Sequence, residues 1–170
     1  ALAVLSRLLA ERDGMPKVTF PQEILRAAEA APHLQPMLDV QRQLFGSRRD
    51  ALRSELAALE QNIAGLHAVG KGFLDSRESK RQQLRLLKEQ IDNMRGLAAD
   101  GYMPRNRLLE QERALAEINS SISGDDGNLG RNLNQIRELQ LQNLQIRTNH
   151  LKEIQTQLAE TQKEVDGLRS

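Results

Sequence analysis

The sequence has 170 residues, of which 39% are hydrophobic and 28% charged, but it contains only three Phe, one Tyr and no Trp. This profile argues against a compact globular core and is typical of extended helices rich in Ala, Leu, Glu and Arg. The 24 basic and 23 acidic residues nearly cancel and are interspersed along the chain, so the sequence predicts no nucleic-acid partner.

Residues 1–33 predict two short helices joined by a connector. Leucines recur at helical spacing through the first twelve residues, and Gly14 then provides a typical helix stop. Pro16 and Pro21 exclude a helix through the connector, because each proline turns the preceding residue away from the helical region. Pro21 can also begin the second helix, which should extend to about residue 31.

The first long arm is predicted over residues 34–99, because no proline occurs between Pro36 and Pro104. From Phe45 onward, a strict alternation of four and three residues defines a seven-residue repeat without a register slip. The repeat positions are Phe45, Arg49, Leu52, Leu56, Leu59, Ile63, Leu66, Gly70, Phe73, Arg77, Lys80, Leu84, Leu87, Ile91, Met94 and Ala98. Most of these positions are apolar, and a repeat of this length favours a coiled coil.

A turn at residues 100–104 should reverse the chain, since Gly101 takes a typical helix-end position and Pro104 can begin the next helix. The second arm, residues 105–169, has two apolar stripes that are slightly shifted from each other. The first stripe contains Leu108, Leu115, Ile118, Ile122, Leu129, Ile136, Leu139 and Ile146, and the second contains Leu144, Leu151, Ile154, Leu158, Val165 and Leu168. We therefore predict a register change near the middle of this arm.

These elements predict an all-α fold: a long antiparallel coiled-coil α-hairpin over residues 34–170, with short extra N-terminal helices packing at its base. Residues that face each other across the turn should then have numbers that sum to roughly 202, because both arms rise equally per residue. This rule places Gly70 near Gly130. Since a glycine inside a helix costs about 1 kcal/mol relative to alanine, we expect residues 121–130 to bend, bulge or open the second arm.

No group of residues predicts catalysis, a metal or a cofactor. The sequence has no Cys, and His33, His67 and His150 lie far apart without an HExxH pattern. Residues 125–128 lack the alternating carboxylates and closing glutamate of a calcium loop. No run approaches the roughly 18 apolar residues that a membrane span needs. The sequence therefore favours a structural or docking role over an enzyme, without a membrane span.

The turn carries the most unusual surface of the sequence. Tyr102, Met103 and two arginines stand close together at the end of the predicted hairpin. Such a mixture of aromatic, Met and Arg side chains favours protein contact. We therefore predict a docking tip at the turn, over residues 101–109 and including Gly101 and Tyr102.

Four segments of the sequence resemble the haemolysin-D-type membrane fusion proteins, the periplasmic adaptors of type I secretion, in the form found in protease and lipase exporters. They are Phe20-Pro21, QLFGSRR at 43–49, LAALEQ at 56–61 and, most specifically, GYMPRNRLLEQE at 101–112. The family's tip motif is an Arg, a Leu four residues on, and a Ser or Thr seven beyond that. Arg105 and Leu109 match it, whereas Ala116 stands at the third position and Ser120 lies one turn further on. The resemblance therefore implies that Arg105 and Leu109 of the tip contact the partner.

The resemblance implies that the hairpin projects from a lipoyl-like domain toward a TolC-type outer-membrane channel. A ring of adaptors would join this channel to an inner-membrane ABC exporter, which places the protein in the periplasm with its full-length form anchored in the inner membrane. The lipoyl halves, the β-barrel and the anchor are not in this sequence, so we expect it to be a fragment of the adaptor. The alternative is a generic coiled-coil scaffold or three-helix-bundle interaction module. Such a bundle needs a third full-length helix, and residues 1–31 are too short and too broken by prolines to form one.

Overall fold

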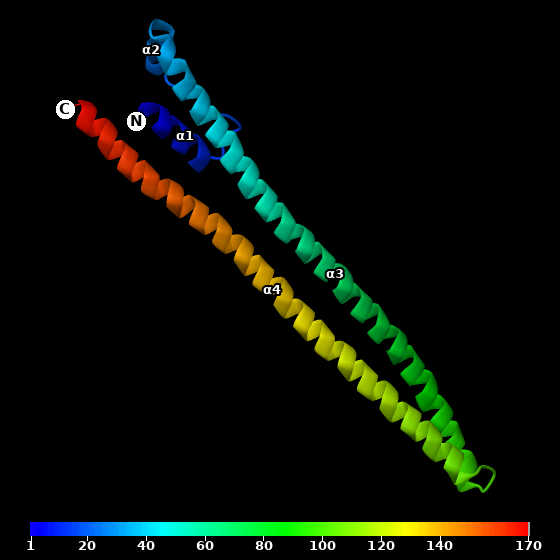
Figure 1. The fold of residues 1–170 in the computed structure, drawn as a ribbon. Coiled ribbons are helices and arrows are strands. Elements are labelled where there is room, and N and C mark those ends of the chain that lie inside the picture. The colour runs from blue at the N-terminus through cyan, green and yellow to red at the C-terminus, as the bar shows by residue number, and fades with distance from the viewer. Residues whose placement is uncertain (170) are drawn as a thin grey trace. The chain divides into compact units, whose positions relative to one another are not determined.

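The computed structural model describes residues 1–169, in which the chain forms four α-helices and one 3-10 helix. In chain order these are α1 (Leu2–Arg12), α2 (Gln22–Ala30), η1 (Pro32–Leu34), α3 (Gln35–Ala99) and α4 (Arg105–Arg169), labelled in Figure 1 where space allows. No strand occurs in these residues, and the two long helices form a hairpin. The predicted all-α hairpin fold is therefore confirmed.

The same backbone motif ends α1 and α3. Gly14 and Gly101 have φ values of 62° and 79°, in the left-handed region that side chains with a Cβ disfavour. After each glycine, the next N–H donates to a carbonyl five residues earlier, with an N···O distance of 2.9 Å in both cases. This is the Schellman arrangement, which satisfies carbonyls at a helix end and stops the helix.

The apolar repeat of α3 forms the seam of the hairpin. Every predicted repeat position from Phe45 to Ala98 is buried or half-buried, including the polar positions Arg77 and Lys80. A coiled-coil seam requires this pattern, because one face of the helix is kept toward its partner over many turns. The predicted heptad register of the first arm is confirmed.

The seam of α4 continues from Leu108 to His150 at alternating spacings of three and four, so the register change predicted near the middle of this arm does not occur there. Its positions are Leu108, Gln111, Leu115, Ile118, Ile122, Asp125, Leu129, Asn132, Ile136, Leu139, Asn143, Ile146 and His150, all buried or half-buried. The spacing changes only after His150, where Ile154, Leu158 and Val165 of the predicted second stripe are buried or half-buried. Leu144 and Leu151 of the same stripe are 61% and 44% exposed. An unbroken helix holds one face toward its partner, so polar residues on that face are buried and leucines beside it are not.

The glycine-rich segment 121–130 is helical without interruption, so the predicted bulge or opening of the second arm is wrong. Asp125 and Asp126 in this segment both bond to cationic side chains of α3. These contacts hold the two helices together where glycine, at about 1 kcal/mol per residue, weakens the helix itself.

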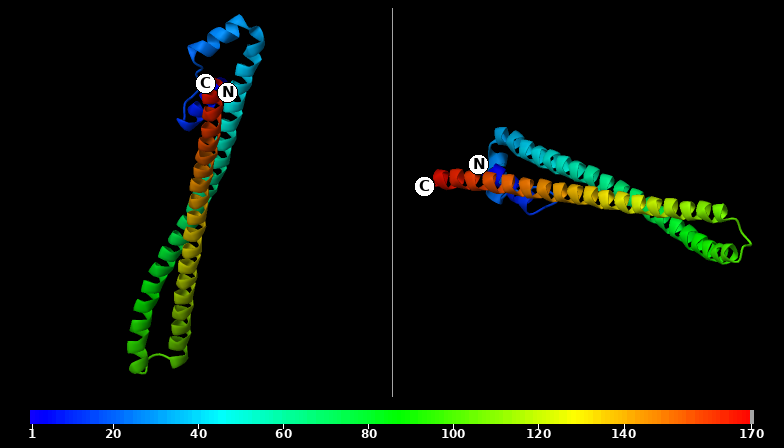
Figure 2. Two further views of the ribbon diagram at one scale, coloured as in Figure 1. Left: turned by 90° about the vertical axis from the view of Figure 1, so that its left-hand side faces the viewer. Right: turned by 90° about the horizontal axis from the view of Figure 1, so that it is seen from below.

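The chain divides into two compact units. Unit 1 comprises residues 1–60 and the chain from residue 141 onward, and unit 2 comprises residues 61–140. Unit 1 therefore holds α1, α2, η1, the beginning of α3 and the end of α4, together with both chain ends (Figure 2). Unit 2 consists of the remaining parts of α3 and α4, which run side by side and are joined by the turn (Figures 1 and 2).

Unit 1 has an apolar core to which the short N-terminal elements contribute. Its buried members are Ala10, Val18, Phe20, Ala28, Leu38 and Phe45. The connector after α1 supplies Phe20, and the guanidinium of Arg42 lies 5.2 Å from the centroid of its ring, a cation–π distance. The N-terminal helices thus pack onto the long helices within this unit, as predicted.

A buried ionic network also joins α1, α3 and α4 within unit 1. The Glu11 side chain is only 3% exposed and bonds to both Arg7 and Arg48, the latter at 3.1 Å. Arg48 also forms an ion pair with Glu153 of α4, with an N···O distance of 3.2 Å. Arg7 Nε donates a hydrogen bond to Gln41 Oε1 at 2.8 Å. A buried carboxylate needs such partners, because an unpaired charge is expensive to remove from water.

Candidate docking site

The tip of the hairpin lies in unit 2 and consists of residues 100–104 with the first turns of α4. Gly101 ends α3 in the left-handed conformation, and the following Tyr102 is 81% exposed. A tyrosine left this open to water presents its ring and its hydroxyl together, which suits contact with another protein. Both residues were predicted as tip residues, and the structure places them in the turn itself.

Arg105 and Leu109 lie one turn apart on one face of α4, because residues four apart on a helix are neighbours. Leu109 is 51% exposed, whereas the adjacent Leu108 turns into the seam. The guanidinium of Arg105 is exposed and has no side-chain partner within residues 1–169. Ala116 and Ser120 follow on the same face and are also exposed. The docking role of these residues stays a prediction.

The helices are tied together directly behind the tip. Arg95 of α3 and Glu112 of α4 form an ion pair with an N···O distance of 2.9 Å. Ile91, only 1% exposed, is the nearest fully buried apolar residue on α3. Because this ion pair holds the two helices together, the exposed turn can present its side chains in one arrangement. Less conformational entropy is then lost on binding.

A first polar layer of the unit 2 seam centres on Asn132, which is 5% exposed. Its amide Nδ2 donates to the backbone carbonyl of Leu66 at 2.8 Å. The space for this side chain comes from Gly70, since a Cβ added there would lie 2.5 Å from Asn132 Oδ1. The residue numbers of Gly70 and Asn132 sum to 202, which confirms the predicted pairing rule.

A second polar layer centres on Asp125, which is 7% exposed. Its Oδ2 accepts hydrogen bonds from Lys80 Nζ at 2.8 Å and from Ser76 Oγ at 3.0 Å. The hydrogen bond from Lys80 lowers the pKa of Asp125, with smaller contributions from Ser76 and from the charge of Arg77, against the opposing effect of burial. Arg77 itself pairs with Asp126 at 2.7 Å.

These two layers were not identified as functional residues from the sequence. The signals were nevertheless present, because Gly70 and Lys80 break the apolar repeat of the first arm and the pairing rule points to the residues opposite them. A polar residue within a coiled-coil seam specifies the register of the helices. The layers therefore bear on how the tip is held rather than on what it contacts.

The part of the chain that the structure describes shows no grouping of three His, Asp or Glu side chains of the kind that could hold a metal ion. Within the same residues, none of the helices is long and apolar enough to cross a membrane.

Comparison with known proteins identifies the family. All of residues 1–170 match the model of the family described as AprE, long alpha-helical hairpin. The chain belongs to this family. The match spans the tip, both long helices and the short N-terminal helices, so the family is defined by the whole of this fold rather than by one motif.

Relatives of the chain are proteins named for secretion. It is 44% identical over 157 residues to the alkaline protease secretion protein AprE of Pseudomonas aeruginosa, covering 92% of this chain and 36% of that protein. It is 27% identical over 118 residues to the proteases secretion protein PrtE of Dickeya chrysanthemi, covering 69% of this chain and 26% of that protein. The chain thus spans about a third of the length of these curated relatives or less.

A solved structure has the same fold. The crystal structure of the soluble domain of LipC, a membrane fusion protein of a type I secretion system, matches with a TM-score of 0.91 and 43% identity. The match covers 99% of this chain and 78% of that one. The predicted resemblance to membrane fusion proteins of type I secretion is therefore confirmed.

Proposed function

We propose that the chain is the hairpin of a periplasmic adaptor for type I protein secretion, of the protease and lipase exporter type. In the full-length protein, copies of the adaptor form a ring that links an inner-membrane ABC exporter to a TolC-type outer-membrane channel. The similarity to the secretion proteins AprE and PrtE and to LipC, a membrane fusion protein of a type I secretion system, supports the secretion role. The hairpin contributes by docking through its tip.

The observation that carries this proposal is the set of unpaired side chains at the tip. Tyr102, Arg105 and Leu109 are all exposed within a short stretch of unit 2, and the helices behind them are tied by Arg95 and Glu112. The Arg105 guanidinium offers five donors to carbonyl or carboxylate groups of a partner, while Leu109 offers an apolar contact one turn away. Recognition of this kind needs no cofactor.

The test is secretion by the full-length adaptor in cells that lack their own copy. We expect Arg105→Glu to reduce secretion by about tenfold or more, because reversing a charge at a docking contact costs several kcal/mol. The matched control is Arg107→Glu, which makes the same charge change at an exposed residue two positions on, where the side chain points to another face. Adaptor levels are compared by immunoblotting.

A photocrosslinking residue at position 102 identifies the partner in the same cells. We expect crosslinks from this position to the outer-membrane channel protein, and their loss in the Arg105→Glu background. Normal secretion by a stably accumulated Arg105→Glu adaptor, or equal defects for Arg105→Glu and Arg107→Glu, would count against docking through this face.

A further inference from the structure

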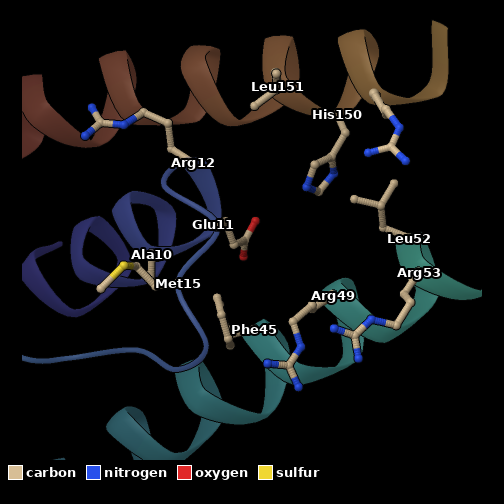
Figure 3. A pocket seen from close by; sticks show the side chains of 12 residues that line it. Ala10, Glu11, Arg12, Met15, Phe45, Arg49, Leu52, Arg53, His150 and Leu151 are labelled. Atoms are coloured by element: carbon tan, nitrogen blue, oxygen red, sulfur yellow. The ribbon is translucent and has the colours of Figure 1, made fainter. Parts of the chain in front are cut away.

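Unit 1 contains a cavity of about 420 Å³ at the end of α1, between the connector that follows it, α3 and α4 (Figure 3). Part of its lining is apolar, from Met15, Phe45, Leu52 and Leu151. Met15 and Leu151 are 48% and 44% exposed. Cavities that hold small ligands have volumes of about 300–1,000 Å³, with an apolar lining and a few polar groups. The cavity has the size and the apolar surface of such a site.

The charged part of the lining is strongly cationic. Arg12, Arg49, Arg53 and Arg147 all contribute, whereas Glu11 is the only acidic residue. Glu11 is already engaged by Arg7 and Arg48 outside the cavity lining. Arg12 is neutralised by Asp13, to which it donates two hydrogen bonds of 2.7 and 3.1 Å. The charge left in the cavity comes from the other three arginines.

Arg49 and Arg53 stand one turn apart on α3, and Figure 3 shows both extending from that helix, with His150 of α4 turned toward the cavity. Arg53 has no polar partner within residues 1–169. Arg49 Nη1 donates to the Pro16 carbonyl at 2.7 Å, but its Nε is buried without a hydrogen bond. Arg49 is therefore incompletely paired. Like charges one turn apart repel each other, and an anion beside the two guanidinium groups would relieve this repulsion.

The third arginine, Arg147 of α4, is also incompletely paired. Its Nε donates to Asn143 Oδ1 at 2.9 Å, while the Glu60 carboxylate is 3.7 Å from its Nη2, beyond hydrogen-bonding distance. The nearest carboxylate to Arg49 Nε, that of Asp50, is likewise 3.7 Å away. The carboxylates of unit 1 therefore leave hydrogen-bond donors of these arginines available to a ligand.

We infer that this cavity binds an organic anion with an apolar chain. A carboxylate or phosphate group accepts hydrogen bonds from Arg49 and Arg53, and the chain covers Met15, Leu52 and Leu151. A second hollow shares Leu52 and both arginines and continues past Leu56 along α3, which gives the chain further apolar surface. Guanidinium groups only donate, and Glu11 is occupied, so a ligand that only accepts hydrogen bonds fits better than a peptide with N–H groups.

Isothermal titration of the 170-residue chain tests this inference with four probes. They are decanoate and decyl phosphate below their micelle concentrations, decanol within its solubility, and inorganic phosphate. We expect one equivalent of decanoate or decyl phosphate to bind, and decanol and inorganic phosphate to bind at least about tenfold more weakly. Tighter decanoate assigns a carboxylate ligand and tighter decyl phosphate a phosphate ligand, and either result supports the anionic site.

Variants of Arg53 locate the site, since this exposed and unpaired residue can be changed without removing a contact of the fold. We expect Arg53→Gln to weaken decanoate or decyl phosphate binding by about tenfold and Arg53→Lys to restore part of it. Arg81→Gln, at an equally exposed and unpaired arginine of unit 2, is the control and should change nothing. Equal binding of decanol, equal effects of Arg53→Gln and Arg81→Gln, or no binding at millimolar probe would overturn the inference.

Discussion

In unit 1 the long helices share their apolar surface with α1 and with Phe20 of the connector, whereas in unit 2 they have only each other. Unit 1 buries Arg7 and Glu11 in a network that joins three helices. Unit 2 instead buries Asp125 and Asn132 within the two-helix seam. A third helix gives unit 1 a defined core, while unit 2 depends on pairwise contacts between α3 and α4.

The difference matters because an apolar heptad seam does not by itself fix a register. A slip of one helix by seven residues again places apolar positions opposite apolar positions. The hydrogen bonds that Asn132 donates to Leu66 and that Lys80 donates to Asp125 form in one register only. The polar layers of unit 2 therefore specify the register of the two helices. In unit 1 the core of varied apolar and aromatic side chains has this role.

The largest expected difference between the units concerns truncation of a buried isoleucine. Ile154 in unit 1 is 0% exposed and Ile91 in unit 2 is 1% exposed. We expect Ile154→Ala to cost about 4 kcal/mol and Ile91→Ala about 2 kcal/mol, because a site enclosed by more elements relaxes less around the cavity. Urea unfolding measures the cost, and hydrogen exchange assigns it to a unit. Leu141→Ala, at an exposed leucine, should change stability by less than about 0.5 kcal/mol.

Equal losses of stability for Ile154→Ala and Ile91→Ala would contradict this difference between the units, since the third helix of unit 1 would then not restrict relaxation around the cavity. A larger cost at Ile91 than at Ile154 would reverse it.

A smaller effect, with opposite signs at two neighbouring glycines, tests the Asn132 layer. Gly72→Ala should stabilise the chain by about 1 kcal/mol, because an added Cβ meets nothing within 4 Å and alanine favours the helix. Gly70→Ala should destabilise it by about 1 kcal/mol, because the Cβ would displace Asn132 from its bond to Leu66. Thermal unfolding followed by circular dichroism gives both values.

The coupling is checked by repeating Gly70→Ala in an Asn132→Ala background. With the amide gone, the substitution at position 70 should become stabilising, like that at position 72. If Gly70→Ala remains destabilising in that background, the glycine is required for another reason.

The helical hairpin and the seam of α3 could be predicted from the sequence because both follow from local signals. The heptads from Phe45 to Ala98 fix one face of α3, and Gly101 with Pro104 marks the turn. The path of the α4 seam could not be predicted in this way, because the apolar residues alone suggested that the seam shifts to the face that carries Leu144. Asn143 holds that position instead. Whether a polar residue is buried depends on its partner in the other helix, which the second arm alone does not reveal.

The two candidate sites also differ in whether local sequence signals predict them. The tip residues Tyr102 and Arg105 were predicted because a turn exposes whatever side chains it carries. The cationic cavity of unit 1 was not, since Arg49 was predicted only as a position of the seven-residue repeat and Arg53 was not singled out. Their place in a cavity depends on α1, its connector and α4 arriving at the same point, and no local pattern encodes that meeting.

The smallest expected effect compares two carboxylates, Asp13 in unit 1 and Asp125 in unit 2. The hydrogen bond from Arg12 lowers the pKa of Asp13, and the hydrogen bond from Lys80 lowers the pKa of Asp125, both relative to 3.8. A lowered pKa in the folded state means that the ionised carboxylate stabilises the fold fully above about pH 4, and that this stabilisation is lost as the pH falls through the folded pKa. We therefore expect the loss of both charges to destabilise the fold as the pH falls below about pH 4.

Salt separates the two groups, because the Arg12–Asp13 pair is about half exposed whereas Asp125 is buried in the seam. In about 0.5 M NaCl the pKa of Asp13 should return toward its usual value, and that of Asp125 should stay low. Carboxyl NMR titrations measure both. Lys80→Met should raise the pKa of Asp125, whereas Lys71→Met, at an exposed lysine of the same helix, should leave it unchanged. A salt-sensitive Asp125 would show that water enters the seam, and the polar layer could not then hold the register against slippage.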